Sequence, residues 1–332
     1  MYINDLPKAS NLSTRLFADD TALAKSSKSL RDLQEQMNME IEKVQGWLIA
    51  NKLSVHYVKK TQYILFLPPS KSNDTDIENF SLFMGGNQIE KTTTYKYLGI
   101  IIDEKLSWKP QIDEMCKKLS SVCGVLSKVR HYLDRHSLLL IYNSLVESRL
   151  RYGILSWSTA CTKQINRLKV LQNRALRFIN FSSMDTAMLP IYSHFKLLPL
   201  CKMISLEQAN FMFRYHNDTL PLAFDTYCER PLHNHYTRFS KTNFRLPSVH
   251  SKTSDKSIKV IGPKIWSEID PDIKALPFRK TFSRYLKNHF ISELPVATTT
   301  TRKKSKINAN SADLSWSEIF ESDDNDESFI GF

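Results

Sequence analysis

The sequence lacks any long apolar run and any cluster of cysteines. No apolar stretch reaches the roughly 18 residues that a membrane span requires, and no basic segment leads into an apolar stretch at the N-terminus, as in a signal peptide. The five cysteines are scattered and form no C-x-x-C pair, which is typical of proteins whose thiols stay reduced. We therefore expect an intracellular, soluble protein with no membrane partner.

Groups suited to zinc binding or to hydrolysis are also sparse. Cys228, His233 and His235 come nearest to a zinc set, but three such residues in one loop are more often solvated side chains. No serine, cysteine or histidine is fixed near a base by the sequence pattern. The sequence therefore favours neither a zinc protein nor a triad hydrolase.

Charge is distributed unevenly along the 332 residues. The net charge is +12, and a strongly basic protein favours a polyanionic partner. From Val296 onward four basic residues are outnumbered by seven acidic ones, so residues 1–295 alone carry +15. A basic body with an acidic tail favours nucleic acid over an acidic small molecule.

The first hundred residues combine strand and helix patterns. Met1–Pro7 alternates apolar with polar residues and stops at a proline, as an edge strand would. Ser29 and Asp32 begin a segment with apolar residues at helical spacing, which predicts a helix. Further β-prone segments are Thr61–Leu67, Ser81–Met84 and Tyr95–Asp103. These patterns predict an α+β region.

Beyond Trp108 the patterns become helical. A heptad seam suited to core packing or to a partner helix consists of Ile112, Met115, Leu119, Val122, Leu126, Val129 and Leu133. Further helices are predicted over Leu138–Ser156, Lys163–Asn180, Met203–His216 and Pro277–Phe290, with breaks at Pro190, Pro199 and Pro221. Residues 231–262 are polar and weakly patterned, and the low-complexity tail from Ala297 is expected to be disordered.

An acidic turn lies between two short β-prone arms. Leu16-Phe17 precedes Asp19-Asp20, and Thr21–Leu23 follows, which predicts a hairpin with both carboxylates exposed at its tip. A second Asp pair, Asp323-Asp324, lacks such flanking residues. Paired carboxylates on a rigid turn suit magnesium, which completes its octahedron with water and substrate phosphate.

These residues carry a resemblance to a known family. The matching segments are Tyr2-Ile3-Asn4-Asp5-Leu6-Pro7, Leu16-Phe17-Ala18-Asp19-Asp20-Thr21, Asn51-Lys52-Leu53-Ser54, Tyr97-Leu98-Gly99 with Leu106 and Trp108, Tyr152-Gly153 with Trp157, and Leu171-Gln172-Asn173-Arg174-Ala175. In this order they resemble the reverse transcriptases of non-LTR, LINE-type retrotransposons, over residues 1 to about 290.

The resemblance implies a division of the chain and a fold. Residues 1–107 would be the C-terminal part of an incomplete reverse-transcriptase palm, of α+β class, and 108–230 a mainly helical thumb and connection. Residues 231–295 would be a C-terminal region ending in a helix, and 296–332 a disordered tail.

The resemblance also implies roles for individual residues. Asp19 and Asp20 would be catalytic and bind magnesium, and Lys60 would lie near the leaving pyrophosphate. Tyr97, Leu98 and Gly99 would form a hairpin that holds the primer end. The implied partners are an RNA template and a DNA primer; the sequence indicates no particular protein partner. Two departures stand out: an apparent insertion around His56 and Tyr57, and Gln111 where the family usually has histidine.

The metal site implied by the resemblance contains a third aspartate on an earlier strand. Only Asp5 precedes Asp19, and it belongs to another motif. We therefore expect the chain to be inactive in isolation, with no fingers and no endonuclease. The alternatives are a non-catalytic nucleic-acid-binding protein derived from a mobile element and a relic without function.

Basic residues also gather on one predicted helix. Lys163, Arg167, Arg174 and Arg177 fall within roughly 80° of one another when residues 163–180 are wound as an α-helix. Such a stripe can follow phosphates, and the thumb helix of the family lies beside the duplex; a solvated helix face is the competing interpretation. Interleaved aromatic and basic residues at Tyr236–Arg245 suggest either a stacking surface for single strands or buried loop aromatics.

Overall fold

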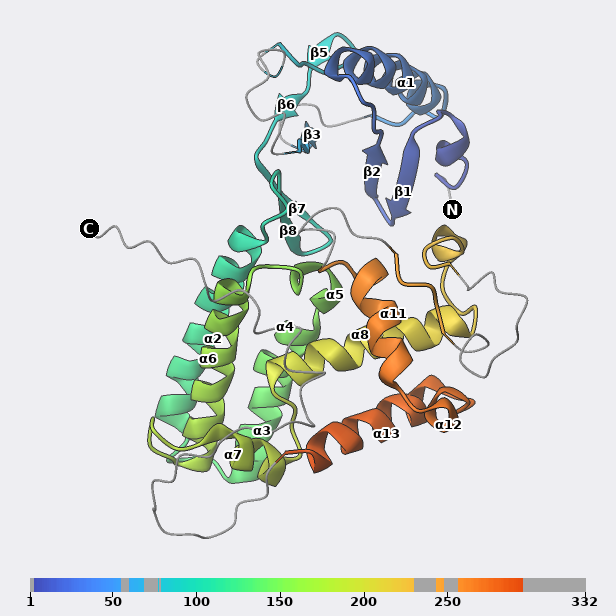
Figure 1. Cartoon of the computed structure of the whole chain (residues 1–332). Coiled ribbons are helices and arrows are strands. Elements are labelled where there is room, and N and C mark those ends of the chain that lie inside the picture. Colours follow the sequence, from blue (N-terminus) through green and yellow to red (C-terminus); the bar gives the residue numbers. More distant parts are fainter. Residues whose placement is uncertain are drawn as a thin grey trace, which may run out of the picture. The chain divides into compact units, whose positions relative to one another are not determined.

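The computed structural model describes residues 3–54, 60–68, 77, 79–229, 243–247 and 256–294 (Figure 1). Contacts divide the chain into two compact units, Met1–Pro110 and Gln111–Phe332. Helices are mixed with small sheets. The predicted α+β class is confirmed at this level, whereas the palm, the thumb and the four-part division stay predictions. The predicted tail lies outside the described residues.

The first unit contains one long helix and short strand pairs. It begins with a 3₁₀ helix, η1 (Leu6–Lys8), the strands β1 (Ser13–Phe17) and β2 (Asp20–Ala24), and the helix α1 (Leu30–Ala50). The strands that follow are β3 (Gln62–Tyr63), β4 (Phe83–Met84), β5 (Asn87–Gln88), β6 (Glu90–Lys91), β7 (Thr94–Tyr97) and β8 (Ile100–Asp103). Pairs β1–β2, β4–β5 and β7–β8 are antiparallel and β3–β6 is parallel. Within the described ranges all sheets are two-stranded.

Helix α1 supplies much of the core of this unit. The hydroxyl of Ser29 accepts the N–H of Asp32 at 3.3 Å and so caps the first turn. Leu30, Ile41 and Val44 are buried against apolar side chains from η1 and the later strands. The apolar spacing therefore predicted both the helix and its buried face correctly.

The second unit begins with two parallel helices that lie side by side (Figure 1). These are α2 (Lys109–Val129) and α6 (Thr162–Asn180). Asp113 of α2 pairs with Arg167 of α6 at 2.6 Å, and Sγ of Cys123 lies 3.6 Å from the carbonyl oxygen of Leu171. Five seam residues from Ile112 to Leu126 are buried. Core packing thus accounts for the seam, while Leu133 lies beyond the helix and is partly exposed.

The chain returns between α2 and α6 through an interrupted helix. Its segments are α3 (Arg135–Tyr142), the π-helix η4 (Asn143–Glu147), α4 (Ser148–Arg151) and α5 (Ile154–Trp157). The interruption before α5 is made by extended Tyr152 and left-handed Gly153, with φ 61°. The indole N–H of Trp157 donates to the Tyr152 carbonyl at 2.9 Å and stabilises this corner.

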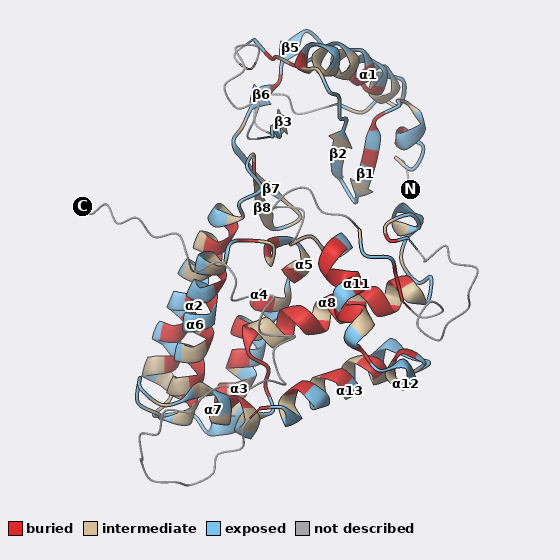
Figure 2. Ribbon diagram, in the orientation of Figure 1, coloured by how far each residue is buried: buried red, intermediate tan, exposed pale blue. Residues whose placement is uncertain are grey.

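Helix α8 (Leu200–His216) is buried on most of its circumference (Figure 2). It contacts α11 (Ile258–Glu268) and α13 (Arg279–Ser292). The Phe213 and Phe282 rings stack at 4.5 Å between centroids. The other short helices are α7 (Met188–Phe195), η5 (Leu222–Phe224) and α12 (Pro271–Lys274). A helix covered on several sides by apolar partners is the core of such a unit.

Several local predictions were wrong. Residues 3–8 form a turn and η1 where an edge strand was expected, because Pro7 fits the first turn of a helix. Pro190 lies inside α7, near its start, and does not precede a break. Helix α11 begins within the weakly patterned segment; its burial against α8 compensates for Pro263, which removes a helical N–H. No helix among the described residues is long and apolar enough to cross a membrane.

Candidate metal centre and nucleic-acid interface

The two aspartates lie at the end of the β1–β2 hairpin. Phe17 pairs with Asp20 across a two-residue loop made of Ala18 and Asp19. Asp19 and Asp20 are exposed, and Ala18 has a φ of 52°. Tight hairpins require positive φ in the loop because this backbone twist matches the strands. The predicted hairpin is therefore confirmed, with both carboxylates open to solvent.

The base of this hairpin is fixed to the core. Leu16 and Leu23 pack against the cluster around α1. The backbone N–H of Asn11 donates to Oε2 of Glu40 at 2.7 Å, while Lys43 Nζ donates to Oε1 at 2.7 Å. The hydrogen bond from Lys43 lowers the pKa of Glu40, and the one from Asn11 adds to this effect. These contacts fix the residues that lead into β1, while the tip of the hairpin stays exposed.

Two adjacent carboxylates fit one magnesium ion. Magnesium is commonly bound through one or two protein carboxylates, with water and phosphate oxygens completing the shell. Among the residues that the structure describes, no group of three or more histidine, cysteine or acidic side chains is arranged to hold a metal. Asp19 and Asp20 therefore have the donor chemistry for one ion, but no third side chain of the described part completes a larger site.

Lys60 is exposed in a turn that leads into β3. The apparent insertion at His56 and Tyr57 lies outside the described residues. The role of Lys60 at a leaving pyrophosphate stays a prediction.

Tyr97, Leu98 and Gly99 form the turn of the β7–β8 hairpin. Tyr97 pairs with Ile100, and the loop residues Leu98 and Gly99 have φ values of 46° and 82°. Positive φ at both loop positions is the geometry of a type I′ turn. The hairpin implied by the resemblance is present; its contact with a primer stays a prediction.

The segment after β8 explains why Leu106 and Trp108 accompany this motif. Both have positive φ, 51° and 61°. The buried Asp103 carboxylate accepts the N–H groups of Ser107 at 2.9 Å and Trp108 at 2.8 Å. This carboxylate holds a loop whose backbone would otherwise be unfavourable.

The four basic residues predicted on α6 differ in their surroundings. Lys163, Arg167 and Arg174 are exposed, and Arg177 is half-buried. Arg167 is paired with Asp113, and Arg177 Nη2 donates to the Thr186 carbonyl at 3.1 Å. The Arg174 guanidinium carbon lies 5.6 Å from the ring centroid of Phe178. Lys163 and Arg174 are thus more available to a ligand than Arg167 and Arg177.

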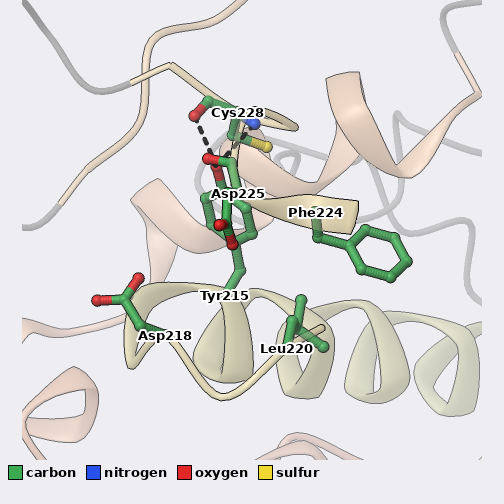
Figure 3. A pocket seen from close by; sticks show the side chains of 6 residues that line it. All are labelled: Tyr215, Asp218, Leu220, Phe224, Asp225 and Cys228. Carbon is green, nitrogen blue, oxygen red and sulfur yellow. Dashed lines mark hydrogen bonds between the residues drawn. The ribbon is translucent and has the colours of Figure 1, made fainter. Parts of the chain in front are cut away.

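A cavity of about 340 Å³, which no sequence pattern indicated, lies where α8 ends (Figure 3). Its lining includes Tyr215, Asp218, Asp225 and Cys228. The Tyr215 hydroxyl donates to the Cys228 carbonyl at 2.8 Å and accepts the Cys228 N–H at 3.0 Å. Burial raises the pKa of the Cys228 thiol to about 11. A thiol protonated at neutral pH is a poor nucleophile or metal ligand.

The zinc and single-strand stacking hypotheses concern residues that lie partly outside the described ranges. His233 and His235, considered as zinc ligands beside Cys228, lie there, as do residues 236–242 of the aromatic and basic segment. Phe244 of that segment is buried, with its ring 5.2 Å from that of Tyr215. Arg245 pairs with Glu229 at 3.3 Å. The buried-aromatic interpretation therefore applies to Phe244.

Comparison with known proteins points to one class, the RNA-directed DNA polymerases of mobile elements. No family model and no solved structure matches the chain. The chain is 26% identical over 179 residues to a probable RNA-directed DNA polymerase from transposon BS of Drosophila melanogaster. It is 25% identical over 167 residues to the RNA-directed DNA polymerase from mobile element jockey of the same species, and 23% identical to that of Drosophila funebris.

These matches confirm the predicted resemblance to non-LTR reverse transcriptases. They cover 49–52% of this chain but only 18–19% of the length of each relative. The chain thus matches less than a fifth of each relative's length.

Proposed function

We propose that this chain carries the Asp-Asp metal hairpin and a nucleic-acid-holding helical segment of an RNA-directed DNA polymerase of a non-LTR retrotransposon. The observation that carries the proposal is the position of Asp19 and Asp20 at the tip of the β1–β2 hairpin. Asp19 lies in its two-residue loop, Asp20 begins β2, and the base of the hairpin packs on α1. The similarity to polymerases of mobile elements supports the same function.

In this proposal Asp19 and Asp20 would hold magnesium, which would supply positive charge opposite the triphosphate and the charge that develops during nucleotidyl transfer. Lys60 stabilises the leaving pyrophosphate, and the Tyr97–Gly99 turn supports the primer end. The exposed position of Asp19, Asp20 and Lys60 is compatible with access by a nucleotide. RNA template and DNA primer are the proposed partners.

The proposal includes a requirement for further protein. The resemblance implies three metal-binding aspartates, and this sequence supplies two of them in the matching positions. Two carboxylates without the third bind a pair of metal ions weakly, because their mutual repulsion is incompletely neutralised. We therefore expect no synthesis by these 332 residues alone.

Primer extension tests both parts of the proposal. The purified chain would be assayed with magnesium and a primed RNA, alone and together with a fragment of a relative that carries the fingers and the earlier palm strand. We expect synthesis only in the mixture, and its loss with Asp19→Asn. The matched control is Asp323→Asn with Asp324→Asn, which changes the other Asp pair of the sequence.

Two results would contradict the proposal. Synthesis by the chain alone, lost with Asp19→Asn, would refute the requirement for further protein. Failure of every polymerase fragment to restore synthesis, with both proteins folded, would refute the catalytic role.

The second candidate is a non-catalytic nucleic-acid-binding protein derived from a mobile element. The exposed Lys163, Arg167 and Arg174 on α6 favour it, because such a face can follow phosphates without any catalytic hairpin. This candidate would be supported over the polymerase by tight RNA binding whose affinity changes neither on removal of magnesium nor in Asp19→Asn, together with no synthesis in any mixture.

A further inference from the structure

Arginine and phenylalanine side chains meet where α2 and α6 end. The spacing of these residues in the sequence did not predict this contact. The guanidinium carbon of Arg130 lies 5.6 Å from the Phe178 ring centroid and 5.3 Å from that of Phe181. Arg174 lies 5.6 Å from Phe178. We call Arg130, Arg174, Phe178 and Phe181 the Arg–Phe cluster. Arg130 directly follows the last residue of α2, Arg174 and Phe178 belong to α6, and Phe181 caps the end of α6, so only the parallel packing of the two helices assembles the cluster.

Phe181 occupies an unusual position for a large apolar residue. It ends α6 with a φ of 53°, a left-handed conformation that favours glycine or asparagine. Its side chain is nevertheless 50% exposed. Neither backbone preference nor burial therefore explains a phenylalanine here, and an outlier of this kind is a reason to look for a ligand.

A further aromatic ring adjoins Phe181. The ring of His131 meets it edge-on, with centroids 5.9 Å apart. Tyr132, the next residue in the chain after His131, is 87% exposed. His131 is also exposed and its Nε2 accepts the Arg130 Nε–H at 3.3 Å, so exposed aromatic residues follow Arg130 directly in the chain.

The two arginines of the cluster keep their charge available. Neither Arg130 nor Arg174 has an ion pair with an acidic group within the part of the chain that the structure describes, whereas Arg167 is paired with Asp113. The nearby Asp134 carboxylate instead accepts the N–H groups of His136 and Ser137 at the start of α3. Asp185, four residues beyond Phe181, is exposed. The cluster therefore combines uncompensated positive charge with exposed aromatic surface.

We propose that the Arg–Phe cluster binds an unpaired segment of RNA. A base stacks on Phe181 while Arg130 and Arg174 contact the neighbouring phosphates. Single strands are the fitting ligand because their bases can leave the stack and present a face to an aromatic ring, which bases inside a duplex do not. RNA is chosen over DNA on the proposed function, since a template for an RNA-directed polymerase is unpaired until it is copied.

Binding to fluorescein-labelled oligonucleotides tests the proposal with the full chain. The probes are an unstructured U-rich RNA of about 15 nucleotides, a DNA of the same sequence, and an RNA duplex of the same length. We expect the single-stranded RNA to bind more tightly than the duplex. Phe181→Leu should weaken single-strand binding about ten-fold, since one stacked base contributes roughly 5- to 150-fold by aromatic removal, and should leave its salt dependence unchanged.

The charge variant gives a different signature. Arg130→Gln combined with Arg174→Gln should weaken binding and lower the salt slope by about 1.4, because each single-strand phosphate contact contributes roughly 0.7. Matched controls lie at the start of α13: Phe278 is 69% exposed and Arg279 is exposed. Phe278→Leu and Arg279→Gln should leave both affinity and slope unchanged.

Phe181→Gly guards against a folding artefact, because glycine suits the left-handed helix end and removes the ring as well. It should reproduce the loss seen with Phe181→Leu. Wild-type affinity in both Phe181 variants, or equal losses on the duplex, would overturn the proposal. Tighter binding to the DNA than to the RNA would overturn the choice of RNA. These outcomes are separate from primer extension, which depends on Asp19 and not on this cluster.

Discussion

The carboxylate of Asp103 accepts the backbone N–H of Trp108 at 2.8 Å and thereby fixes the loop that follows β8. The second oxygen accepts the N–H of Ser107. Asp103→Ala should lower the free energy of unfolding by about 2 kcal/mol, because two backbone N–H groups lose their charged acceptor. Asp103→Asn should cost about half as much, since an amide retains one acceptor oxygen.

Hydrogen exchange at Ser107 and Trp108 measures this loss directly. Faster exchange is expected in Asp103→Ala, with Asp103→Asn intermediate. Glu104→Ala is the neighbouring control and should leave both amides protected. Unchanged protection in Asp103→Ala would show that the loop does not depend on the carboxylate.

Glu40 should make the first unit sensitive to acid. Hydrogen bonds from Lys43 and Asn11 lower the pKa of this carboxyl below its usual 4.5. A lowered carboxyl pKa contributes stability that is present above pH 4.5 and is lost as the pH falls through the folded-state pKa. The protection factor of the Asn11 amide, which is its exchange rate relative to the intrinsic rate at the same pH, should therefore fall on acidification.

Glu40→Gln should remove most of this acid sensitivity. Glu42, exposed on the same helix, supplies the control Glu42→Gln. An acid response that is the same in Glu40→Gln and in the wild type would refute the assignment to Glu40.

Lys274 should make stability rise with pH as well, but in the alkaline range. It is buried, its Nζ donates to Asn243 Oδ1 at 3.0 Å, and burial lowers its pKa to about 8 from 10.5. The unfolded chain therefore holds the proton more tightly than the folded protein does. The cost of burying the charged Lys274 is fully present below pH 8, and the free energy of unfolding rises with pH between about 8 and 10.5. The full difference corresponds to roughly 3 kcal/mol.

Chemical denaturation of the full chain at about pH 7.5, 9 and 10.5, which spans the two pKa values, measures this rise. Lys274→Met should abolish the part of it that Lys274 contributes, whereas Lys280→Met, at an exposed position of α13, should not. Equal pH dependence in wild type and Lys274→Met would count against a neutral lysine in the folded state.

A methyl group should destabilise the protein at Gly262 but not at Gly124. A Cβ at Gly262 would lie 2.5 Å from Sδ and 3.2 Å from Cγ of Met212, which is fully buried in α8. Gly262→Ala should therefore lower the free energy of unfolding by about 1 kcal/mol, because the cost of overpacking against Met212 outweighs the gain in helix propensity.

Gly124 lies within α2, and no described atom outside its own helix backbone comes within 4 Å of the position that a Cβ would take. Gly124→Ala should stabilise by up to about 1 kcal/mol. Both effects can be read as shifts of the denaturation midpoint. A stabilising Gly262→Ala would mean that α8 and α11 adjust more easily than their close packing indicates.

Local sequence patterns predicted the elements whose formation depends on residues close together in the chain. The 3.6-residue spacing predicted α1, α2, α6, α8 and α13, and the Asp19-Asp20 turn predicted the β1–β2 hairpin. Strand lengths were overestimated: of Thr61–Leu67 only Gln62–Tyr63 is a strand, and of Ser81–Met84 only Phe83–Met84. β propensity depends on neighbouring strands that a sequence does not specify, so these segments were not predictable from composition.

The hairpin aspartates, the basic residues of α6 and the resemblance to retrotransposon polymerases follow from the sequence, because each depends on residues close together in the chain. Tertiary structure decided which charges remain available: it pairs Arg167 with Asp113 and leaves Arg174 and Arg130 on phenylalanine rings. Residues 130 and 174 are far apart along the chain, so no spacing rule relates them. Only the parallel packing of α2 and α6, set by burial of their apolar faces, brings the two arginines to the same rings.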